Sequence, residues 1–126
     1  MGTSEKRKRR AANRIFQSYT VLVGNTRIPL RDSPSAKDLL REFAAPFAPF
    51  AGSEQLLYFI AISAWNLSQF DDERRARLTD ELVTSLSPGA TEASRRLRDV
   101  LDALVERRVT LYRNETIAFI PNRDDA

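Results

Sequence analysis

Few side chains in this sequence are suited to catalysis. The 126 residues include no histidine and no cysteine, so the commonest general base, the commonest transition-metal ligand and any thiol nucleophile are missing. Carboxylates remain, and Asp71, Asp72 and Glu73 lie next to one another. Because the dipole of a helix favours acids in its first turn, we interpret these three as the start of a helix. We therefore expect no catalytic residue, no metal site and no cofactor, and we predict that the protein is not an enzyme.

A run of five cations near the N-terminus is the most prominent charged motif. Cations beside phosphates release counterions, so such a run favours binding to nucleic acid, and it equally suits an acidic protein or simply improves solubility. Because like charges resist compaction, we predict a disordered basic arm over residues 1–10. The five cations of the run and one arginine downstream are expected to contact nucleic acid or an acidic partner. These residues are Lys6, Arg7, Lys8, Arg9, Arg10 and Arg14.

The charges are unevenly divided along the chain. Residues 1–50 carry ten Lys and Arg against four Asp and Glu, a net charge of +6, while residues 51–126 carry ten against thirteen, a net charge of −3. A surface of one sign attracts partners of the other sign. The sequence therefore places the contact with an acidic partner or nucleic acid in its N-terminal part.

The spacing of apolar residues predicts the elements that surround these motifs. Runs rich in β-branched and aromatic residues predict short β-hairpins near residues 19–30 and 109–120. A helix capped by Asp32 or Ser33 is expected to end before Pro46, and residues 44–52 are predicted to be an apolar linker packed on the core. Two further helices are predicted, one opened by the three acids and one over residues 91–108.

The strongest predicted element is a helix over about residues 53–70. Seven adjacent apolar or small residues, Leu56 to Ile62, follow its N-terminus without a polar interruption, and a helix that is apolar all round is a buried helix. It is too short to span a bilayer. One side of it is either core or an interface with a protein partner or a second copy, and we single out four residues for this role: Leu57, Phe59, Ile62 and Trp65.

Residues 91–112 permit a second interpretation. Their sequence, TEASRRLRDVLDALVERRVTLY, resembles the recognition helix and wing of winged-helix regulators over about a quarter of the chain. The resemblance implies a DNA-binding helix over 91–108, a wing at 109–120 and DNA contacts from Thr91, Ser94, Arg95 and Arg98. Against it, residues 71–108 hold eight basic and nine acidic residues, whereas DNA-binding regions are usually strongly basic.

Together these patterns predict an α+β fold, mainly α. We expect a compact bundle of three to four helices in a single globular domain over residues 11–122, with a frayed tail at 123–126. The favoured function is that of a small, non-catalytic accessory or adaptor subunit in the cytoplasm, which acts through protein contacts and a basic N-terminal region. The alternative is a winged-helix-type DNA-binding protein. We expect neither a membrane nor a small-molecule substrate among its partners.

Overall fold

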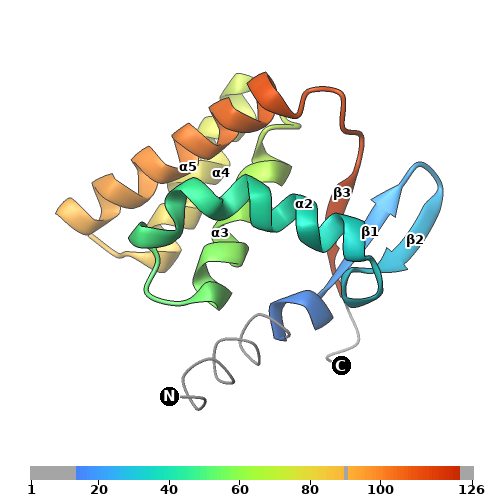
Figure 1. Ribbon diagram of the computed structural model, residues 1–126. Helices are drawn as coiled ribbons and strands as arrows, with labels where there is room; N and C mark the ends of the chain where they lie inside the picture. The colour runs from blue at the N-terminus through green and yellow to red at the C-terminus, as the bar shows by residue number, and fades with distance from the viewer. Residues whose placement is uncertain (1–13, 90, 123–126) are drawn as a thin grey trace, which may run out of the picture.

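The fold is α+β and mainly α, as the sequence predicts. The computed structural model describes residues 14–89 and 91–122, and in Figure 1 the helices gather on one side with a small sheet beside them. Residues 14–17 are helical. The elements that follow are β1 (Tyr19–Val23), β2 (Thr26–Pro29), the 3-10 turn η1 (Leu30–Asp32), α2 (Pro34–Ala44), the 3-10 helix η2 (Ala45–Phe50), α3 (Glu54–Leu67), α4 (Asp72–Leu86), α5 (Glu92–Leu111) and β3 (Ala118–Pro121).

The first predicted hairpin is confirmed. β1 and β2 pair antiparallel with Val23 opposite Thr26, and Gly24 in the turn has a φ of 63°, a conformation that costs glycine little. Pro29 ends β2 and the chain continues into η1. In the three-stranded sheet β2 thus forms one edge and β1 the centre.

The second predicted hairpin, at 109–120, is wrong. Residues 109–111 form the last turn of α5, and β3 pairs antiparallel with β1, with Phe119 opposite Val21, to give the strand order β2-β1-β3. The amide of Asn66 on α3 covers the outer side of β3, because its nitrogen donates to the carbonyl of Phe119 at 2.9 Å. The strand therefore joins the sheet through contacts distant in sequence rather than through a local turn.

Serine residues cap the N-termini of α2 and α3 at positions that the sequence predicts. The hydroxyl of Ser33 accepts from the amide of Ala36 at 3.3 Å, and that of Ser53 accepts from the amide of Leu56 at 3.1 Å. α3 packs against α2, α4, α5 and β3, so it is the central helix that was predicted. Its buried residues are Leu57, Tyr58, Ile60, Ala61, Ile62, Ala64, Trp65 and Leu67.

Trp65 lies at the centre of the core and is fully buried. Its ring packs edge-on against Phe43 and Phe119, and its indole nitrogen donates to the carbonyl of Ile117 at 2.9 Å. It thereby links α2, α3 and the segment before β3. A tryptophan buried in this way fills the core and also satisfies its one polar atom.

A buried arginine fixes the end of α5. Arg108 is 8% exposed, its guanidinium lies 4.2 Å from the ring of Trp65, and it donates to the carbonyls of Tyr112 and Glu115. Burial lowers the pKa of Arg108, since desolvation disfavours the charged form. The side chain holds the loop after α5 against the core, and this loop leads the chain into β3.

Candidate functional site: an apolar groove at one end of the bundle

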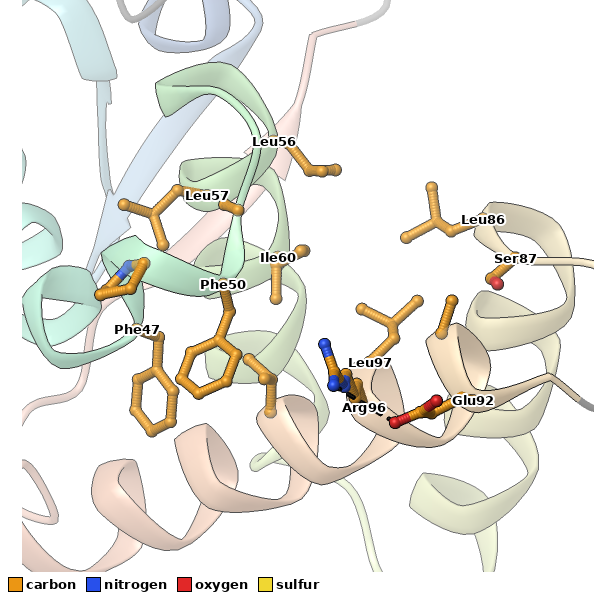
Figure 2. A pocket seen from close by; sticks show the side chains of 14 residues that line it. Phe47, Phe50, Leu56, Leu57, Ile60, Leu86, Ser87, Glu92, Arg96 and Leu97 are labelled. Atoms are coloured by element: carbon orange, nitrogen blue, oxygen red, sulfur yellow. Dashed lines mark hydrogen bonds and ion pairs between the residues drawn. The ribbon is translucent and has the colours of Figure 1, made fainter.

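A groove of about 650 Å³ opens between four elements of the bundle. Figure 2 shows η2 and the beginning of α3 on one side, the end of α4 on the other, and the first turns of α5 below them. The lining is mainly apolar: Phe47, Pro49, Phe50, Ala51, Leu56, Leu57, Ile60, Leu86, Ser87, Glu92, Ala93, Arg96, Leu97 and Val100. Its volume falls within the range of pockets that bind small molecules and cofactors.

The 3-10 helix η2 places two aromatic rings on the same side of the chain. In a 3-10 helix, residues three apart eclipse each other, and Phe47 and Phe50 are so spaced, with ring centroids 6.3 Å apart. Phe47 is half-buried, whereas Phe50 is 64% exposed. The linker predicted to pack on the core does so in part: Phe47 and Ala51 pack against the core, no residue of Ala45–Phe50 is buried, and exposed Phe50 forms one edge of the groove.

The two walls come from helices that approach each other at this end of the bundle. Leu56 and Ile60 lie one turn apart on α3, and Leu86 is the last residue of α4. Leu56 and Leu86 are each 38% exposed, while Ile60 is buried. The floor is formed by Leu97 and other apolar side chains of α5. The groove is thus open to solvent at Leu56 and Leu86, and it is closed at its base by buried residues such as Ile60.

One ion pair lies at the rim. Arg96 and Glu92, one turn apart on α5, approach to 3.2 Å, with side chains 70% and 75% exposed. An exposed pair of this kind contributes about 0.3–0.5 kcal/mol to a helix. The rim therefore carries one charge of each sign, and the interior offers van der Waals contacts rather than groups for acid–base chemistry.

The N-terminal basic residues predicted to contact nucleic acid or an acidic partner lie only in part within the residues that the structure describes. The cations Lys6, Arg7, Lys8, Arg9 and Arg10, the predicted disordered arm and the predicted frayed tail at 123–126 lie outside the described residues. Arg14 is described and exposed, at the start of a short helical segment. Arg14 is not among the residues that line the groove.

The four residues of the winged-helix resemblance are largely occupied with local structure. Thr91 caps α5, and Ser94 is buried in the reciprocal capping box with it. Arg98 forms an ion pair of 2.5 Å with Asp80 on α4, and Arg95 is exposed. The wing on which the resemblance depends, the hairpin at 109–120, is the element that the structure contradicts.

The four residues chosen on α3 belong mainly to the core. Ile62 and Trp65 are 1% and 0% exposed, Leu57 is 7% exposed and also lines the groove, and Phe59 is half-buried. Of these four only Leu57 lines the groove, and sequence analysis did not single out Phe50 and Leu86, the exposed residues at its edges. The signal for Phe50 is the repeat of Pro and Phe at a spacing of three in APFAPF.

The three adjacent acids have the structural role that was predicted. Asp71 caps α4, and its carboxylate accepts from the amide of Arg74 at 2.8 Å, while Asp72 pairs with Arg75 at 3.3 Å. Within residues 14–89 and 91–122, no group of three or more acidic side chains is arranged to hold a metal ion.

Comparisons with known protein families, characterised proteins and solved structures find no match for this chain. Among the helices that the structure describes, none combines the length and apolar character needed to cross a membrane.

Proposed function

We propose that this protein is a small, non-catalytic adaptor that works in the cytoplasm through protein contacts, with the apolar groove as its main contact surface. The observation that carries the proposal is the concentration of exposed apolar side chains at the groove. In the described part of the chain six large apolar side chains are exposed, and three of them, Phe50, Leu56 and Leu86, line this one groove. Exposed apolar clusters with a polar rim mark sites of protein interaction.

The energetics favour a protein partner. Fully burying one large apolar side chain is worth about 1.5–3 kcal/mol, and Phe50 is 64% exposed in the isolated chain. Aromatic residues, phenylalanine among them, are enriched in the buried part of protein interfaces. A partner that inserts apolar side chains between Leu56 and Leu86 would cover all three exposed residues at once.

The N-terminal cations are the second contact surface of the proposed adaptor. The run Lys6–Arg10, with Arg14, suits an acidic protein or the backbone of a nucleic acid, bound with little sequence preference and with a strong dependence on salt. If replacing the run by Ser leaves nucleic-acid binding intact while Arg95→Ala and Arg98→Ala remove it, the winged-helix interpretation replaces this part of the proposal.

Photo-crosslinking in the producing cells tests the groove. A photoreactive phenylalanine analogue replaces Phe50 in one variant and Leu111 in a matched control, since Leu111 is also apolar and is 63% exposed, on α5 away from the groove. We expect a discrete protein adduct from position 50 and only background from position 111. Equal or absent adducts at the two positions would contradict the proposed function.

A further inference from the structure

The groove and the side chain at its edge form a self-complementary surface. Phe50 on η2 is 64% exposed and lies at one side of the groove of about 650 Å³, so the projecting ring and the groove share one face of the molecule (Figure 2). In a dimer with twofold symmetry the same patch meets itself, so a projection on one copy must face a hollow on the other. A patch that holds both features side by side has the elements that this condition requires.

We propose that the partner of the groove is a second copy of this chain, in a twofold dimer in which Phe50 of each copy enters the groove of the other. The proposal rests on the groove being a protein-contact site, as inferred above, and names its occupant. It places Phe50 between Leu56 and Leu86 of the second copy, so that each of the exposed apolar residues at the groove becomes buried on both copies.

The charges at the rim favour this occupant. The charged lining residues are Glu92 and Arg96, one of each sign and one turn apart on α5. Two antiparallel copies of this turn place Glu92 of one opposite Arg96 of the other, which gives two attractive pairs across the axis.

A dimer formed in this way carries two copies of the cationic run Lys6–Arg10. Once one run is bound to an acidic surface, the second binds at an effective concentration set by the tether rather than by bulk solution. The dimer would therefore hold an acidic partner more tightly than a monomer, with no additional contact on either chain.

Light scattering on the full-length chain tests the dimer. The molar mass is followed by size-exclusion chromatography from about 1 µM to about 200 µM, since dimerisation follows mass action. We expect the wild-type chain to reach the mass of a dimer and Phe50→Glu to raise the dissociation constant by about thirtyfold or more. Leu111→Glu, which adds the same charge at an equally exposed position, should leave the dissociation constant unchanged. Circular dichroism is the control that each variant is folded.

A mixing experiment tests the pairing across the axis. Glu92→Arg leaves only positive charges at the two rim positions and Arg96→Glu only negative ones, so each variant alone should dimerise about tenfold more weakly than the wild type. An equimolar mixture of the two should recover the dimer, because each chain then meets the opposite charge. Rescue by mixing arises only from a contact between chains and is independent of any effect on the fold.

Three results would overturn the proposal. These are a wild-type chain that stays monomeric over the whole concentration range, a dimer weakened by Leu111→Glu and not by Phe50→Glu, and a mixture of the two rim variants that dimerises no better than either alone. A monomeric chain that nevertheless forms a discrete adduct with another protein from position 50 overturns only the second copy as occupant and leaves the adaptor function standing. Absence of both dimer and adduct overturns both proposals.

Discussion

Removal of the buried guanidinium at the end of α5 gives the sharpest test of how this fold is held together. Arg108→Met keeps the length and apolar stem of the side chain but removes its donors to the carbonyls of Tyr112 and Glu115 and its contact with the ring of Trp65. Both carbonyls then lose their charged donor. We expect the variant to fold with lower stability and with a loosened loop between α5 and β3.

The magnitude follows from three contributions. Two hydrogen bonds from a charged donor are worth about 1.5–3 kcal/mol each, and a desolvated cation–π contact is worth about 2 kcal/mol. These gains are offset by the cost of burying a charged side chain, since Arg108 is only 8% exposed and its Nε has no hydrogen-bond partner, and this cost amounts to several kcal/mol. The net expectation is a loss of about 2–3 kcal/mol in the free energy of unfolding, or roughly 10 °C in melting temperature.

Chemical denaturation and amide hydrogen exchange measure this effect. Arg95→Met is the matched control, because Arg95 is an exposed arginine on the same helix, and it should change the free energy of unfolding by less than about 0.5 kcal/mol. In Arg108→Met the amide of Glu115, which donates to the carbonyl of Tyr112, should exchange faster. An Arg108→Met protein as stable as the wild type, with unchanged exchange at Glu115, would refute the role assigned to this arginine.

Three further outcomes are expected. Trp65→Ala should lower the free energy of unfolding by about 3–5 kcal/mol and Phe59→Ala by about half as much, because Trp65 is fully buried and Phe59 half-buried; equal losses in urea titrations would count against this. Burial raises the pKa of Tyr19, so its contribution to stability is complete below the unfolded pKa of about 10 and is lost as the pH rises above it. Tyr19→Phe should make the alkaline decline shallower in unfolding curves, and an unchanged decline would contradict it. Replacing Lys6–Arg10 by Ser should change the free energy of unfolding by less than about 0.5 kcal/mol while abolishing salt-dependent binding to a polyanion, and a large loss of stability would make the segment structural.

The sequence predicts this fold well wherever local signals decide the structure. Ser33 and Ser53 cap the helices where capping rules place them, and the apolar run after Ser53 forms the central helix. Gly24 supplies the positive φ that the first hairpin needs. In each case the determining interaction lies within a few residues along the chain, so a pattern in the sequence is sufficient to identify it.

Prediction fails where distant contacts override local preference. Residues 109–111 favour a strand by type, yet they extend α5, and Arg108 and Tyr112 then fix the turn that delivers β3 to β1. The pairing of β3 with β1 spans about a hundred residues of sequence, and no local pattern encodes it. Tertiary context of this kind commonly overrides intrinsic β propensity.

The groove was missed for a related reason. Apolar residues at a spacing of three in Ala45–Phe50 predict a segment that packs on the core, but the eclipsed geometry of a 3-10 helix puts Phe47 and Phe50 on one side. Phe47 packs against the core, whereas Phe50 stays 64% exposed at the edge of the groove. The spacing of apolar residues predicts which of them lie on the same side of a segment. It does not predict whether a neighbouring helix covers them.

Footprinting of Phe50 in living cells tests the central claim most directly, namely that the groove is a covered protein-contact surface in the working molecule. Hydroxyl-radical labelling of Phe50 and Leu111 is measured in cells and normalised to the denatured chain, since the two side chains are 64% and 63% exposed in the isolated protomer. A covered groove predicts that Phe50 is labelled several-fold less than Leu111. Equal normalised labelling of the two residues would show that the groove is open in the cell and would contradict the proposed function.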